Sequence, residues 1–135
     1  MTLPRQNAGQ HIARIHARRF LDASARQMYD ANLETVPNVT RISYAFVSGY
    51  NALQAIQPPY HGSPGDHPLI SIVKDGATIC RLSKSDLALG LRLLRWEDHG
   101  RYYFEPSPAS VQEAISWAGR VRDAVLKHQA TKANG

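Results

Sequence analysis

The chain of 135 residues lacks the sequence features of several large protein classes. It has a single cysteine, Cys80, which excludes an internal disulfide framework and a cysteine-rich zinc site. No apolar run approaches the roughly 18 residues that a membrane span requires, and the opening segment MTLPRQNAGQ lacks the apolar centre of a signal peptide. We therefore expect a cytoplasmic protein that does not enter a membrane.

Enzyme motifs of fixed spacing are missing as well. The sequence has no P-loop, no G-x-G-x-x-G and no serine in a G-x-S-x-G turn. No two of the six histidines stand four residues apart, as ligands on one helix face would. A metal site formed by His61, His67 and Asp66 in one loop is the weaker interpretation, so we expect no metal ion and no cofactor. Cys80 falls on an apolar helix face, which is typical of a small buried hydrophobe.

The composition is that of an ordinary globular domain. Apolar residues make up 43% of the chain and charged residues 20%, and Lys plus Arg outnumber Asp plus Glu by 16 to 11. The length predicts one domain over residues 1–135, ordered from about residue 9 to about residue 128 with flexible ends. The net charge of +5 is compatible with a binding domain, a ribonuclease or an adaptor and does not decide between them.

Apolar residues recur at spacings of three and four, which predicts an all-α bundle of four or five helices. Asn38 is the expected N-cap of the second helix, and Ser83 or Ser85 that of the fourth. Ser110 and Glu113 form a capping box ahead of the fifth. The predicted helices cover residues 11–32, 38–57, 69–82, about 84–98 and about 110–129.

The second and fifth predicted helices carry the most extensive apolar faces. The second has Arg41 as its only charge, so we place it at the centre of the bundle with Phe46 deeply buried. Gly49 and the alanines beside it would let a neighbouring element approach closely. The first and fourth helices are expected to pack against these two. The expected buried stripe of the fifth helix is Val111, Ala114, Ile115, Ala118, Val121 and Val125.

The first predicted helix has two distinct faces. One carries Ala13, Ala17, Phe20, Leu21, Ser24 and Met28, and we expect it to be buried. The other carries Arg18, Asp22, Arg26 and Asp30, each four residues from the next. This ladder is either a phosphate-binding stripe or a solvated face with ion pairs, and the second interpretation is favoured because each arginine has a carboxylate neighbour.

The third predicted segment, 69–82, follows the loop 58–68, which is rich in proline and glycine. Its apolar spacing predicts a helix, with Asp66 as a possible cap. The alternative is a β-hairpin, because ISIV and ATIC are β-prone and flank the turn signal Asp75-Gly76. We favour the helix because an isolated hairpin is marginally stable and the other segments are helical.

The densest polar cluster is RLLRWEDHGRYYFE, residues 92–105. His99 is the candidate general acid or base, and Arg92 or Arg95 could stabilise a phosphorane. Metal-independent cleavage of RNA needs little more, because the 2′-hydroxyl supplies the nucleophile. Arg101 and Tyr102 join Arg95 as candidate RNA- or phosphate-binding residues.

The same cluster has a structural interpretation, which we favour. Glu97 and Asp98 can pair with the arginines, and Trp96 and the tyrosines can form the edge of the core.

Most of the chain, from about Ala8 to His128, resembles a HEPN-type helical domain. The resemblance rests on the stretches QMYDANL, SYAFVSGYNALQAI, HPLISIV, LLRWEDHGRYYFEPS and VQEAISWAGRVRDAV. It implies a homodimer in which the ends of the two fourth helices form one composite cleft.

Catalytic members of that family have an arginine, then a polar residue, and a histidine after four to six intervening positions. Here Arg92 stands at the right distance from His99 but is followed by Leu93, and Arg95 is too close and is followed by Trp96. The resemblance thus favours a noncatalytic binding domain, a toxin–antitoxin component or a partner of a nucleotidyltransferase-like protein. The alternatives are a metal-independent ribonuclease and a helical adaptor with no nucleotide role.

Overall fold

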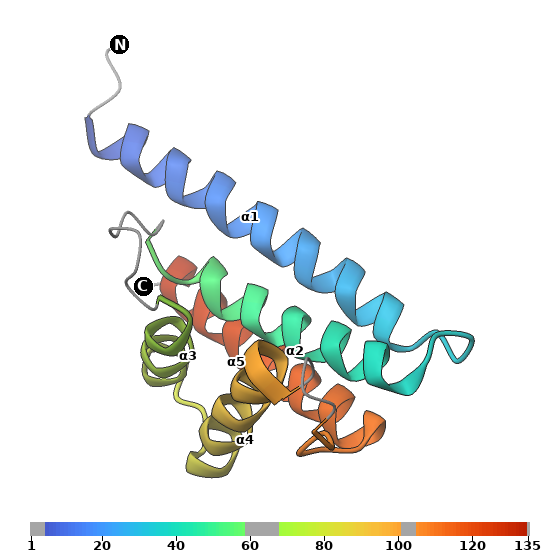
Figure 1. The fold of residues 1–135 in the computed structure, drawn as a ribbon. Coiled ribbons are helices and arrows are strands. Elements are labelled where there is room, and N and C mark those ends of the chain that lie inside the picture. Colours follow the sequence, from blue (N-terminus) through green and yellow to red (C-terminus); the bar gives the residue numbers. More distant parts are fainter. Residues whose placement is uncertain (1–4, 59–67, 101–104, 135) are drawn as a thin grey trace.

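The protein is a helical bundle in which α1 runs opposite to α2 and α5, described by a computed structural model over residues 5–58, 68–100 and 105–134 (Figure 1). The described residues form helices and connecting turns but no strand, so the predicted all-α architecture is confirmed. None of the described helices is long and apolar enough to cross a membrane. The elements are α1 (Arg5–Ala31), α2 (Asn38–Ala55), α3 (Pro68–Ile79), α4 (Lys84–Arg95), the π-helical turn η1 (Trp96–Gly100) and α5 (Val111–Asn134).

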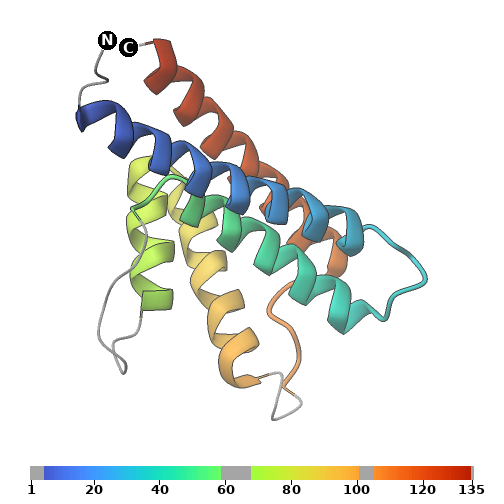
Figure 2. The same ribbon diagram turned by 90° about the horizontal axis from the view of Figure 1, so that it is seen from above.

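The helices form layers around α2. α1 lies along one side of α2, and α5, α3 and α4 lie on the other side (Figure 1). Seen from above, α1 and α2 run side by side, and α3 and α4 stand next to each other at an angle to them (Figure 2). The prediction that α2 is central is confirmed, and its Phe46 is 3% exposed. The prediction that α5 is the next most buried helix is wrong, because α5 is long and buries a smaller fraction of its residues than α3 or α4.

The centre of the core is Trp117 on α5, which has no exposed surface. Its indole stacks on Phe46 with ring centroids 6.0 Å apart, and its Nε1 donates to the Asp86 carbonyl oxygen at 2.9 Å. A Cβ on Gly49 would lie 2.5 Å from the indole ring, so α2 can approach this closely only with glycine there. The close approach expected at Gly49 is confirmed, whereas sequence reasoning did not place Trp117 in the buried stripe of α5.

A buried pair of serines joins α1 to α2. Ser24 Oγ donates to the Ser48 carbonyl oxygen at 2.7 Å, and Ser48 Oγ donates to that of Ser24 at 2.8 Å. Arg122 on α5 adds a third link, because its Nε donates to Ser24 Oγ at 3.1 Å. The buried hydroxyls are thus satisfied, and their small side chains let the two helices pack closely.

Local signals set the starts of two helices. Ser83 Oγ accepts a hydrogen bond from the Asp86 amide at 3.1 Å, which confirms Ser83 as the N-cap of α4. The Ser110 amide donates to Glu113 Oε1 at 3.2 Å and the Glu113 amide to Ser110 Oγ at 3.1 Å, as a capping box requires. These bonds lower the pKa of the Glu113 carboxyl.

Other helix ends differ from the prediction. Pro37, not Asn38, caps α2, because its carbonyl oxygen accepts from the amides of Thr40 and Arg41, both at 3.0 Å. α1 begins at Arg5, well before residue 11, although Asn7 and Gly9 are poor helix formers. α5 continues to Asn134, beyond its predicted end near residue 129.

The third segment is helical, as predicted, and not a hairpin. It ends in a Schellman-type turn in which the Leu82 amide donates to the Ala77 carbonyl oxygen at 2.9 Å. Arg81 holds the left-handed position of this turn with φ 59°. Asp66, the suggested cap, lies outside the described residues.

Candidate functional site

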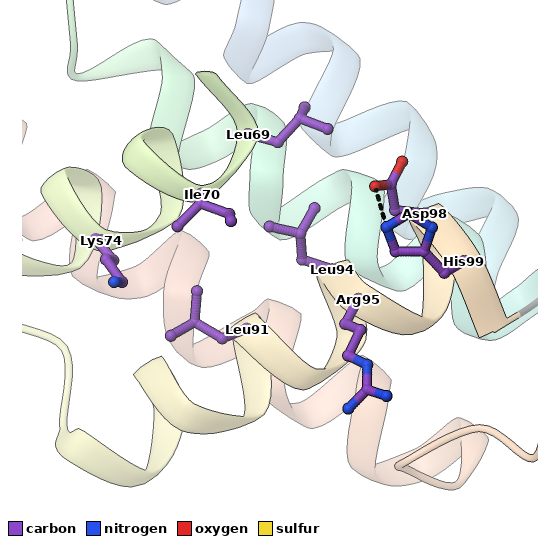
Figure 3. A pocket seen from close by; sticks show the side chains of 8 residues that line it. All are labelled: Leu69, Ile70, Lys74, Leu91, Leu94, Arg95, Asp98 and His99. Carbon is purple, nitrogen blue, oxygen red and sulfur yellow. Dashed lines mark ion pairs between the residues drawn. The ribbon is translucent and has the colours of Figure 1, made fainter. Parts of the chain in front are cut away.

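A groove of about 530 Å³ opens between α3 and the end of α4 (Figure 3). Its volume falls within the range of ligand and peptide sites. We call it the α3–α4 groove. It is lined by Leu69, Ile70, Lys74, Leu91, Leu94, Arg95, Asp98 and His99.

The floor of the α3–α4 groove is apolar because α3 has more apolar residues than the core can cover. Ile72 and Val73 of α3 are buried in the core, 8% and 1% exposed. Ile70, on another side of the same helix, remains 47% exposed and points into the groove (Figure 3). A helix that is apolar on more than one side ordinarily has a second partner to cover it.

The rim of the α3–α4 groove carries an excess of positive charge. Lys74 stands on the α3 side and Arg95 on the α4 side (Figure 3). Within the described part of the chain, neither has an acidic partner within 4 Å. The single carboxylate of the rim, Asp98, is paired with His99, whose Nε2 lies 3.1 Å from its Oδ2.

The π-helical turn η1 decides which side chains of the polar cluster face the groove. Trp96 turns inward, 3% exposed, and its Nε1 donates to the Glu105 carbonyl oxygen at 3.0 Å. Glu97 is fixed to α2, because Ser43 Oγ donates to its Oε1 at 2.8 Å. Asp98 and His99 are left on the outside. π-helical turns are frequent at functional sites, where they redirect side chains in this way.

The site residues expected from the sequence are brought together only in part. Arg95 and His99 are exposed and line the same groove, whereas Arg92 is exposed but is not among the lining residues. Arg101 and Tyr102 lie outside the described residues.

Sequence reasoning did not name the apolar residues of the groove, or Lys74, as site residues. Leu94 is also part of the core, 6% exposed, and Leu69 and Leu91 pack against the core. The sequence did contain a signal for this groove. α3 has apolar residues, such as Ile70, on a side other than the one that faces the core.

The other reactive side chains do not form a site among the described residues. No group of three or more His, Cys, Asp or Glu side chains there could hold a metal ion. His61, His67 and Asp66 lie outside those residues. Cys80 is buried, and burial raises the pKa of its thiol. The protonated thiol, which is not nucleophilic, is therefore favoured over the thiolate.

Comparison of the chain with known protein families, with characterised proteins and with solved structures finds no match.

Proposed function

We propose that the protein is a noncatalytic helical binding domain, and that the α3–α4 groove binds an amphipathic helix of a partner protein. The observation that carries the proposal is an apolar floor between two helices, with Ile70 half exposed at its centre. Helical ligands commonly bind such grooves through apolar side chains spaced by three and four residues.

Charge selects the class of partner. Lys74 and Arg95 stand on opposite sides of the floor without acidic partners in the described part of the chain. A bound helix with glutamates or aspartates flanking its apolar stripe would pair with both, so an acidic helix is favoured over a basic one. The resemblance to HEPN-type domains suggests that this helix belongs to a nucleotidyltransferase-like protein or a toxin–antitoxin partner. A helical adaptor with no nucleotide role would use the same groove.

Two designed peptides test the proposal. Each has about 18 residues, or roughly 27 Å of helix, and both have the same stripe of leucines along one face. In one peptide the residues on either side of the stripe are glutamates, and in the other they are lysines. We expect the acidic peptide to bind at least about tenfold more tightly by fluorescence anisotropy at low salt, equivalent to about 1.4 kcal/mol. Equal binding of the two peptides would contradict the proposed charge selection.

Two exposed apolar positions provide a matched pair of variants. Ile70→Glu places a charge on the floor of the groove and should abolish binding. Val39→Glu makes the same change at a residue 48% exposed at the start of α2, outside the groove, and should leave binding unchanged. Binding that survives Ile70→Glu would place the peptide elsewhere, and circular dichroism of both variants checks the fold.

Cleavage of RNA is the second candidate function. It is supported by Arg95 and His99 in one groove and by the carboxylate of Asp98, which can orient the His99 imidazole. It is weakened at Trp96, which takes the place of the family's polar residue and is buried with its indole N–H bonded to Glu105. We expect no cleavage of single-stranded RNA with metal chelated. Cleavage that His99→Ala abolishes while RNA binding persists would establish the enzyme instead.

A further inference from the structure

The solvent side of α1 is a second surface whose composition points to a partner. α1 buries Ser24 and Ala31 toward the bundle, and all other helices lie on that one side of it (Figures 1 and 2). The opposite side of the helix, here named the outer face of α1, is open along its length. Its residues, related by helical spacing, are Ile12, Ile15, Arg19, Asp22, Arg26 and Tyr29.

Apolar side chains are exposed at both ends of the outer face of α1. Ile12 is 60% exposed and Ile15 47% near its beginning, and Tyr29 is 69% exposed near its end. Ile12 and Tyr29 are separated by 17 positions, which corresponds to about 26 Å along the helix axis. Exposed apolar residues rimmed by charge are typical of interaction surfaces.

Charge is distributed unevenly along α1. The part from Arg5 to Arg19 contains four arginines and no acidic residue. The part from Phe20 to Ala31 contains two aspartates and one arginine, and Glu34 follows in the next turn. One half of the helix is therefore basic, and the other is weakly acidic.

The ladder of ion pairs expected within α1 does not form. Among the described residues, no arginine of this helix has a carboxylate oxygen within 4 Å. Long exposed side chains gain little from such pairs in water. The charges of the outer face thus remain free to pair with another molecule.

We propose that two copies of the chain associate through the outer faces of α1, packed antiparallel about a two-fold axis. This arrangement sets the basic half of each helix against the acidic half of the other, whereas a parallel arrangement would set arginines against arginines. In the register that pairs the charges, Arg19 faces the partner subunit's Asp22, and Ile12 faces the partner subunit's Tyr29. Each contact occurs twice because the two-fold axis repeats it.

The proposed dimer is independent of the α3–α4 groove. The outer face of α1 points away from α3 and α4, so both grooves of a dimer would stay open to ligand (Figure 1). A failure of the peptide experiment would therefore leave the dimer proposal standing, and the reverse also holds.

Charge reversal and charge exchange test the pairing by sedimentation velocity at low salt, from about 1 to about 200 μM. We expect wild type to dimerise, and Arg19→Asp or Asp22→Arg to weaken the dimer at least about tenfold. The double variant Arg19→Asp/Asp22→Arg should return to within about threefold of wild type, because it exchanges the two partners. Lys84→Asp makes the same change of charge at an exposed residue at the start of α4 and should have no effect.

A disulfide trap tests the register in a chain whose only native cysteine is replaced, Cys80→Ala. The double variant Ile12→Cys/Tyr29→Cys should form a covalent dimer on oxidation, while each single variant should stay monomeric on a reducing-agent-free gel. Crosslinking of each single variant would indicate a parallel dimer and overturn the proposal. So would a wild-type monomer at 200 μM, or a dimer that Arg19→Asp leaves intact.

Discussion

The core around Trp117 and the α3–α4 groove are built from similar apolar side chains, but they are packed to very different degrees. Trp117 is fully enclosed, and a Cβ at Gly49 or Gly90 would meet its ring at 2.5 or 3.0 Å. Leu69, Leu91 and Ile70 instead line open space. The tightest packing thus surrounds Trp117, and the groove between α3 and α4 is left open to solvent.

The largest expected contrast between these regions comes from truncating one side chain in each. Trp117→Ala should lower the free energy of unfolding by about 3–5 kcal/mol, because it leaves a large cavity and removes the hydrogen bond from the indole to the Asp86 carbonyl oxygen. Ile70→Ala should cost less than about 1 kcal/mol, since that side chain is already 47% exposed. Chemical denaturation measures both, and similar losses would contradict the division between core and groove.

Two helical glycines sharpen the contrast further. Gly49→Ala should destabilise the protein by about 1–3 kcal/mol, because the new methyl group overlaps the Trp117 ring. Gly119→Ala has no atom within 4 Å of the new methyl group and should stabilise α5 by up to about 1 kcal/mol through helix propensity. A Gly49→Ala variant as stable as wild type would show that the indole can move aside.

Arg81 lies at the turn that joins the two walls of the groove. Its left-handed φ of 59° is costly for a residue with a side chain. Arg81→Gly should therefore raise the free energy of unfolding by about 0.5–1 kcal/mol, after the greater freedom of glycine in the unfolded chain is subtracted. Arg81→Lys keeps both the strain and the positive charge and should leave stability unchanged. Thermal denaturation distinguishes the two, and equal effects would assign the change to loss of the guanidinium group instead of relief of strain.

Tyr50 on α2 supplies the smallest effect, visible in alkali. Burial raises the pKa of its phenol to about 12, although a hydrogen bond with Gln54 opposes the shift. As pH rises above about 10, the unfolded chain loses this proton while the folded chain keeps it, so the free energy of unfolding falls. The loss should stay below about 1 kcal/mol at pH 11, because the phenol is partly exposed to solvent.

Tyr50→Phe should flatten this alkaline slope. Tyr29→Phe removes a phenol that is 69% exposed and should leave the slope as it is in wild type. Denaturant titrations at several alkaline pH values compare the three proteins. An unchanged slope in Tyr50→Phe would assign the alkaline loss of stability to other groups.

Sequence reasoning predicted much of the fold because several of its determinants are local. The caps at Ser83 and at Ser110 involve partners only three residues away, and both are found as predicted. The helical assignment of α3 held because its apolar spacing fits a helix packed on the core, and Ile72 and Val73 face inward as that spacing requires.

The candidate site was less accessible to the same reasoning. Arg95 and His99 were named from the composition of one segment, and the structure places both on the rim of a groove. Arg92 lies on α4 beyond the groove lining, although its distance from His99 along the chain fits the expected motif. The π-helical turn between Arg92 and His99 changes the angle between successive side chains. The number of residues between the two therefore does not determine whether their side chains point the same way.

The amino-acid sequence by itself determined where α4 and α5 start, which helix faces are apolar and that α2 is central, because capping and periodicity act within one or two turns. Only the tertiary structure decided that Trp117 is the centre of the core, since its burial depends on Gly49 and Gly90 of two other helices. It likewise decided that the apolar side of α3 is left uncovered and that Ile12, Ile15 and Tyr29 of α1 are exposed to solvent. Which surfaces a bundle buries depends on how its helices are placed against one another, and that is a property of the whole chain.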